Sequence, residues 1–136
     1  MNTPVGSNNG LNTLASNHDV KTTADRLESI LQEKGMNIFA RVNHTAGAEK
    51  IGESLRPTEL IIFGNPQTGT PLMQEQQTAA IDLPQKMLAW EDDQGKVWLS
   101  YNKPSYVAER HGITACGELV NKITTALASI ADDTCR

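Results

Sequence analysis

Residues 86–101, Lys-Met-Leu-Ala-Trp-Glu-Asp-Asp-Gln-Gly-Lys-Val-Trp-Leu-Ser-Tyr, decide the fold. Two runs within them, Lys86–Glu91 and Lys96–Tyr101, alternate at period two, and the four residues between the runs end in Gly. Alternation of this kind is typical of half-buried strands, and a short loop containing Gly is typical of a hairpin. The pattern therefore predicts an antiparallel hairpin, with Trp90 and Trp98 near opposite ends of the pairing, where they could face the same side.

Upstream of the hairpin, three further strands are predicted. Leu60-Ile61-Ile62-Phe63 is a continuous apolar run, which indicates a strand buried on both faces. The run stops at Gly64-Asn65-Pro66, residues that disfavour continuing the hydrogen-bond ladder of a sheet. The stretch Met36–Val42 alternates at period two. Leu11–Asn17 alternates more weakly and is expected to form an edge strand.

The first helix has the clearest pattern. Asp19 stands where an N-cap belongs and Gly35 where a helix stops, and between them an apolar stripe recurs at three- and four-residue spacing: Val20, Ala24, Leu27, Ile30 and Leu31. A second helix is predicted over Ala46–Leu55, capped by Thr45, with Ala48, Ile51 and Leu55 facing inward.

Three more helices are predicted in the second half of the chain. Pro71 suits the start of a short helix over Leu72–Ala80, and Pro104 precedes another over Ser105–Arg110. A long final helix is expected after Thr114 as its cap, with an apolar stripe of Leu119, Val120, Ile123, Leu127 and Ile130. The irregular order of elements predicts an α+β fold, a mainly antiparallel sheet with helices packed on one face.

Size and composition limit the number of domains and the classes of partner. The 136 residues suit one domain, expected over 11–136, after a disordered Asn/Ser/Gly-rich tail over 1–10. The net charge is -4 and no run of Lys or Arg could neutralise a row of phosphates, so no nucleic-acid partner is expected. No stretch approaches the roughly 20 apolar residues that span a bilayer, so no membrane association is expected.

The compartment is predicted from the N-terminus and the cysteines. The first ten residues lack the basic and apolar regions of a signal peptide, which indicates the cytoplasm, or the periplasm if a signal peptide has been removed. Cys116 and Cys135 flank the final helix, roughly 28 Å apart at a rise of about 1.5 Å per residue. Both are therefore expected to be free thiols.

Three residues are the candidates for a site. His44 follows a strand and precedes a helix, where an imidazole could serve as a general base or metal ligand. Asn65, just after the apolar run, offers a hydrogen-bond donor and an acceptor. Asp82, before Leu83-Pro84, offers a carboxylate. Each of the three also has a plain structural interpretation, as a helix cap or a turn residue.

These candidates leave the function open. One hypothesis is a small-ligand or metal-binding domain with a crevice near His44, Asn65 and Asp82. The alternatives are an enzyme in which His44 is the acid/base and Asp82 orients it, and a purely structural or partner-binding module. Because the chain contains no P-loop, dinucleotide fingerprint, Cys-x-x-Cys or nucleophile elbow, binding is favoured, and no particular cofactor or metal is indicated.

Several segments of the sequence occur together in one known family. They are Lys34–His44, Leu60–Pro66, Gly69–Met73, Ile81–Pro84 and Gly95–Tyr101. From about Asp19 to Ile113 the chain resembles the bacterial and archaeal family known as domain of unknown function 302. The resemblance implies an α+β domain with an antiparallel sheet and a homodimer. The chain departs from the family at Asn43, where the family often has Asp before the histidine. If that Asp binds a metal in relatives, the departure weakens the case for a metal here.

Overall fold

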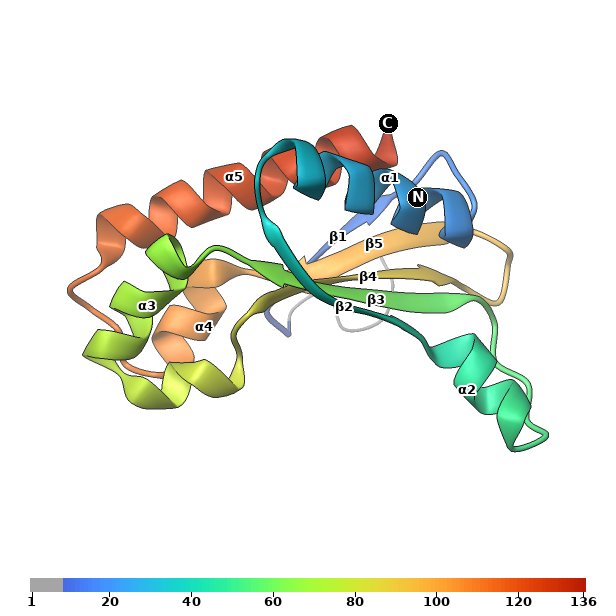
Figure 1. Cartoon of the computed structure of the whole chain (residues 1–136), viewed down its shortest axis with the longest axis horizontal. Coiled ribbons are helices and arrows are strands. Elements are labelled where there is room, and N and C mark those ends of the chain that lie inside the picture. Colours follow the sequence, from blue (N-terminus) through green and yellow to red (C-terminus); the bar gives the residue numbers. More distant parts are fainter. Residues whose placement is uncertain (1–8) are drawn as a thin grey trace.

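The strands form a five-stranded sheet in the order β1-β5-β4-β3-β2, with every neighbouring pair antiparallel. The structure is a computed structural model and describes residues 9–136 (Figure 1). Its strands are β1 (Leu11–Ala15), β2 (Asn37–Asn43), β3 (Thr58–Gly64), β4 (Gln85–Glu91) and β5 (Val97–Asn102). The predicted α+β fold with an antiparallel sheet is confirmed, whereas most of the predicted tail, residues 1–8, lies outside the described residues.

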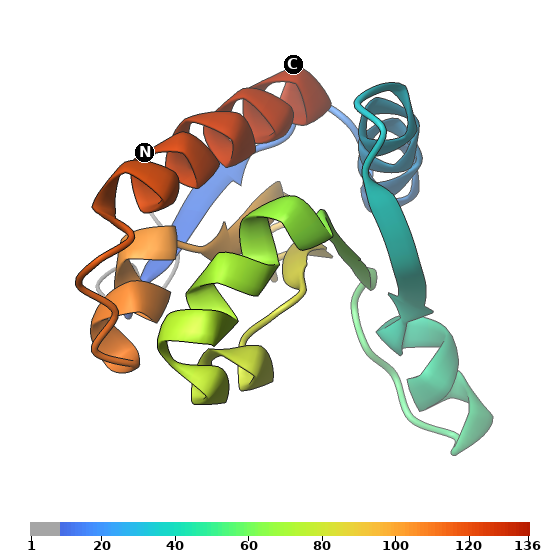
Figure 2. The ribbon, with the colours of Figure 1, turned by 60° about the vertical axis from the view of Figure 1, so that its left-hand side comes forward.

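Two long helices cover one face of this sheet. Helices α1 (Val20–Glu33) and α5 (Gly117–Cys135) lie side by side above the strands, as both views show (Figures 1 and 2). The shorter helices lie toward the ends of the sheet: α2 (His44–Lys50), α3 (Pro66–Glu75), the 3-10 helix η1 (Gln77–Ile81) and α4 (Pro104–Arg110). The predicted one-sided packing is thus confirmed for α1 and α5.

The hairpin of β4 and β5 supplies much of the core. In its register Met87 lies opposite Tyr101 and Ala89 opposite Leu99, and all four side chains are buried toward α1 and α5. On the other face Trp90 lies directly opposite Trp98, rather than at the other end of the pairing, with the two ring centroids 6.5 Å apart. The Trp90 indole N–H donates a 2.9 Å hydrogen bond to the Ser100 hydroxyl, so this end of the second face is packed as well.

The middle of that second face is also apolar. Because side chains alternate along a strand, the neighbours of the core residues Ile61, Phe63 and Met87 point away from the helices. These neighbours, with the matching residues of β2, are half-buried and form what we call the outer patch: Ala40, Val42, Leu60, Ile62 and Leu88. Figure 1 shows no described helix across this face.

Helix α2 differs from its prediction. It begins at His44 with Asn43 as its cap and ends at Lys50, and none of its residues is buried. Ile51 and Leu55, predicted to face inward, are 76% and 44% exposed. The helix stops short of the predicted Leu55 because Gly52, with a φ of 78°, leaves the helical conformation, so both side chains lie beyond it.

Two other helices start elsewhere than predicted. Asn65 caps α3 with Pro66 as its first residue, so that helix begins before Pro71 rather than at it. Helix α5 begins at Gly117 rather than directly after Thr114. The Thr114 and Ala115 N–H groups just before it donate to the Glu75 carboxylate, at 2.8 and 3.1 Å.

Two isoleucines of opposite exposure test this account of the core. Ile130 on α5 is fully buried, whereas Ile81 in η1 is 73% exposed. We expect Ile130→Ala to lower the free energy of unfolding by about 2–5 kcal/mol, because a cavity is left behind. Ile81→Ala should stay within about 0.5 kcal/mol of the wild type. Urea denaturation followed by circular dichroism measures both values, and equal losses would contradict the packing described.

Candidate functional site

The three predicted site residues do not meet at one place. In the β2–β3 ladder Asn37 lies opposite Gly64 and Asn43 opposite Glu59. His44 and Asn65 directly follow these strands, so they leave the ladder at opposite ends, separated by roughly 20 Å of strand. Asp82 precedes β4, whose Gln85 lies opposite Phe63, and is therefore at the Asn65 end. The structure brings Asn65 and Asp82 to one end of the sheet and puts His44 at the other.

A cavity of about 310 Å³ opens at the Asn65 end. We call it the strand-end cavity; it lies between the end of β3, α3, the segment before β4 and α5. Its walls are mostly apolar and contain no charged side chain: Phe39, Gly64, Asn65, Pro66, Thr68, Gly69, Thr70, Leu72, Met73, Ala80, Leu83, Pro84, Gln85 and Ile123. Such a lining suits an uncharged, largely apolar molecule.

Asn65 both builds this cavity and lines it. Its side-chain oxygen accepts a 2.9 Å hydrogen bond from the Gln67 N–H, which caps α3, and its carbonyl accepts from the Thr68 N–H and hydroxyl. Within residues 9–136 its amide nitrogen makes no hydrogen bond, so the two N–H groups remain as donors beside the cavity.

Asp82 is held by the end of α4. Its carboxylate accepts a 2.6 Å hydrogen bond from His111 Nε2 and two 3.0 Å bonds from Arg110 Nη1. Since a carboxylate only accepts, Nε2 carries the proton, and the other ring nitrogen lies 3.1 Å from the Thr78 hydroxyl. The His111 side chain is 7% exposed and Asp82 is 16% exposed.

This cluster fixes one wall of the strand-end cavity. Ala80, Leu83 and Pro84 line the cavity on the same segment as Asp82. Lys86 holds that segment from the sheet side, because its ammonium donates to the carbonyls of Asp82 and Pro84 at 3.2 and 2.9 Å. Burial lowers the pKa of Lys86.

The acid–base pair considered from the sequence, His44 with Asp82, is therefore not formed. The imidazole that contacts Asp82 is His111, 29 positions along the chain, and no local sequence pattern connects the two. His44 is the exposed first residue of α2. Its neighbour Asn43 accepts a 2.9 Å hydrogen bond from the Ala46 N–H, the same capping contact that an Asp would make.

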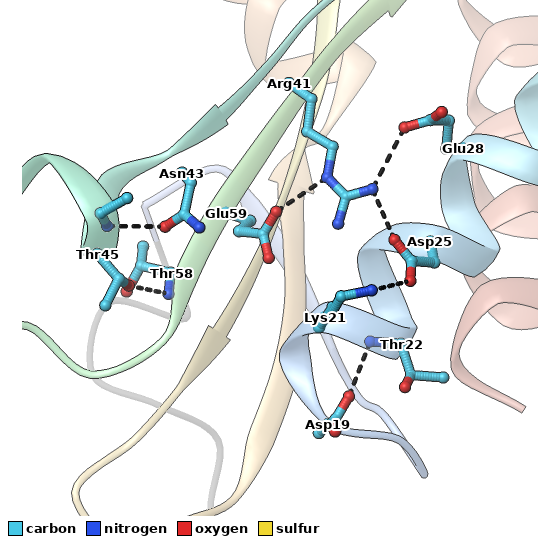
Figure 3. Close-up of polar contacts among 11 residues, drawn as sticks. Asp19, Lys21, Thr22, Asp25, Glu28, Arg41, Asn43, Thr45, Thr58 and Glu59 are labelled. Carbon is cyan, nitrogen blue, oxygen red and sulfur yellow. Dashed lines mark hydrogen bonds and ion pairs between the residues drawn. The ribbon is translucent and has the colours of Figure 1, made fainter.

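At the His44 end, a charge network surrounds Arg41 (Figure 3). The guanidinium donates to Glu59, Asp25 and Glu28 at 2.9, 2.7 and 3.3 Å, and so ties β2 to β3 and α1. Burial opposes the charge of Arg41, but the hydrogen bonds to Glu59 and Asp25 outweigh burial and raise its pKa. Because the Arg41 guanidinium is already paired with these carboxylates, we interpret the network as structural.

The residues described contain no metal site of the usual kind. Within 9–136, no three His, Cys, Asp or Glu side chains are grouped so that they could hold an ion.

Comparison with known proteins identifies the family. The model of the family described as "Domain of unknown function DUF302" matches residues 12–130. The chain belongs to the DUF302 family. A solved structure, the uncharacterised conserved DUF302 protein from Bacillus stearothermophilus, has the same fold, with a TM-score of 0.82 and 22% sequence identity. The match covers 93% of this chain and 98% of that one.

Other relatives of this DUF302 chain are longer proteins. It is 50% identical over 113 residues to a protein named fluoride-specific ion channel FluC 1 from Brucella suis biovar 1, covering 83% of this chain and 44% of that protein. The fluoride-specific ion channel FluC 2 of Brucella melitensis biotype 1 matches equally, with 42% of its length covered. The chain thus spans less than half the length of these curated relatives. None of its helices in residues 9–136 is long and apolar enough to cross a membrane.

The Asp82–His111 contact can be tested with a double-mutant cycle. We expect Asp82→Ala and His111→Ala to be coupled by about 1–3 kcal/mol in the free energy of unfolding, because each removes the other's hydrogen-bond partner. The control cycle pairs His111→Ala with Asp93→Ala in the exposed hairpin turn and should be additive. Additivity in the first cycle as well would contradict the contact.

Proposed function

We propose that this domain binds a small, uncharged and mainly apolar molecule in the strand-end cavity. The observation that carries the proposal is the lining of that cavity, apolar over most of its walls and free of charged side chains. A charged ligand would lose its hydration there without gaining an ionic partner, which is unfavourable. An uncharged ligand meets no such cost.

The cavity also constrains the size and polarity of the ligand. Its volume of about 310 Å³ is roughly twice the ~150 Å³ that accommodates a benzene ring in a dry protein cavity. The Asn65 amide, the Thr68 hydroxyl and the Gln85 amide stand among the apolar walls as hydrogen-bonding groups. We therefore expect a molecule of two or three rings, or a branched chain of similar size, with one polar end.

A dye-binding assay tests this proposal. The uncharged probe N-phenyl-1-naphthylamine should bind with saturation at one site, seen as an increase in its fluorescence. Gly69→Leu should weaken binding at least about tenfold, because the new side chain enters the cavity. A Cβ at Gly69 meets only Met73 Cε, at 3.8 Å, so the backbone need not move.

The matched control is Gly47→Leu, which also places a leucine on a helix, in α2 and in open space. It should leave the affinity for the dye unchanged. Equal affinities of the wild type and Gly69→Leu, or no saturable binding by the wild type, would overturn the proposal.

We propose a cytoplasmic location for the protein. The support is that Cys116 and Cys135 are both free thiols, which fits a reducing compartment. Burial raises the pKa of Cys135 to about 11, so its thiol is poorly suited to act as a nucleophile.

The relatives favour a second candidate function, an accessory domain that acts on a fluoride channel. Two of the curated relatives named as channels are 50% identical to this chain over 113 residues and extend well beyond the match. Since the chain has no helix in residues 9–136 that could cross a membrane, we propose that the matched region of those proteins is not the pore. This chain would then act on a pore of the same kind.

Fluoride release from proteoliposomes tests this candidate. The vesicles carry the Brucella suis protein from which the matched region has been removed. Adding the wild-type chain should change the rate of fluoride release at least about twofold, with saturation as the chain concentration rises. An unchanged rate at every chain concentration would contradict the accessory role, while leaving ligand binding in the cavity untouched.

A further inference from the structure

The orientation of the Asn65 side-chain amide is fixed by its role as a helix cap. Asn65 lines the strand-end cavity, and its side-chain oxygen accepts a 2.9 Å hydrogen bond from the Gln67 N–H. If this amide turned over, its NH2 group would meet the Gln67 N–H, donor against donor, and the cap would be lost. The NH2 group therefore stays on the side away from Gln67 and can only donate.

The other polar groups at the start of α3 have no proton left to donate. The N–H groups of Thr68 and Gly69 donate to the Asn65 carbonyl at 3.0 and 3.1 Å, and Pro66 has no N–H. The Thr68 hydroxyl donates to the same carbonyl at 3.0 Å, so its oxygen offers the cavity only an acceptor. Within residues 65–69 the Asn65 NH2 group is the donor that remains for a ligand.

Gln85 is the second amide in the lining, and its orientation is not fixed. It lies opposite Phe63 in the β3–β4 ladder, so its side chain is on the same face of the sheet as that buried ring. Its amide makes no hydrogen bond within residues 9–136. Because it can rotate to offer either its oxygen or its NH2 group, Gln85 suits any polar ligand. The choice between acceptors and donors is therefore made by Asn65.

We propose that the strand-end cavity selects uncharged carbonyl compounds, whose oxygen accepts a hydrogen bond from the Asn65 side-chain N–H. This inference rests on the proposed function, because it concerns the polar end of the ligand that the same cavity binds. A molecule that fills the cavity displaces water from the Asn65 N–H groups. A carbonyl oxygen restores the lost hydrogen bond, whereas a hydrocarbon leaves the donors unpaired and binds more weakly.

Two ligands of the same shape test this selectivity. 1-Acetonaphthone carries a ketone on two fused rings, and 1-isopropenylnaphthalene has a CH2 group in place of the ketone oxygen. Displacement of bound N-phenyl-1-naphthylamine measures the dissociation constant of each. The wild type should bind the ketone at least about tenfold more tightly, because only the ketone pairs with the Asn65 N–H groups. The greater hydrophobicity of the hydrocarbon acts in the opposite direction.

Asn65→Asp removes the donor and keeps the cap. One carboxylate oxygen still accepts from the Gln67 N–H, and the other takes the place of the NH2 group. Since a carboxylate only accepts, the preference for the ketone should disappear, and the two dissociation constants should agree within about twofold. The matched control is Asn43→Asp, the same substitution at the cap of α2, where Asn43 accepts from the Ala46 N–H at 2.9 Å. It should keep the wild-type preference.

Nuclear magnetic resonance of the wild type gives a second measurement that needs no variant. The signals of the Asn65 side-chain NH2 group should move downfield when the ketone binds, because its protons enter a hydrogen bond, and should move less with the hydrocarbon. Identical shifts with the two ligands would refute the inference.

The displacement assay separates this inference from the proposed function. A wild type that binds the dye but holds the ketone no more tightly than the hydrocarbon would overturn the inference alone. A full preference for the ketone in Asn65→Asp would overturn it as well. If the wild type binds no dye that either ligand displaces, the proposed function itself fails and the inference fails with it.

Discussion

Strand β3 is apolar on both faces, and the rest of the structure depends on that constraint. Ile61 and Phe63 point to one side of the sheet, where α1 and α5 bury them. Leu60 and Ile62 point to the other side and are half-buried. Burying both faces of a central strand removes far more apolar area from water than burying one. The chain itself covers the first face, whereas no helix within residues 9–136 lies across the outer patch.

The same strand creates the candidate site by the way it ends. At Gly64 a side chain would press against Pro84, whose Cβ lies 3.3 Å from the position of a Cβ. This close approach lets the segment before β4 come up to the strand end, where Asn65 turns the chain into α3. Asp82, held by Arg110 and His111, keeps that segment in place. The strand-end cavity is thus the space left where a sheet, two helices and a tethered loop meet.

Local signals in the sequence were sufficient for much of the fold. The hairpin, the cap of α1 at Asp19 and the edge position of β1 depend on neighbouring residues, and all were predicted. Ile51 and Leu55 were predicted inward on a helix running to Leu55, but the helix ends at Lys50, just before Gly52 with its φ of 78°. The predicted crevice joined residues that the antiparallel register sends to opposite ends, and the contact of Asp82 with His111 joins positions too distant for any pattern to relate.

Urea denaturation of two matched variants, Ile61→Ala and Ile62→Ala, tests most directly how the two faces of β3 are covered. Ile61 is 1% exposed under the helices, whereas Ile62 is half-buried on the outer patch. The account predicts that Ile61→Ala lowers the free energy of unfolding by about 2–5 kcal/mol, because a cavity is left behind. Ile62→Ala should lower it by clearly less, and equal losses would contradict the account.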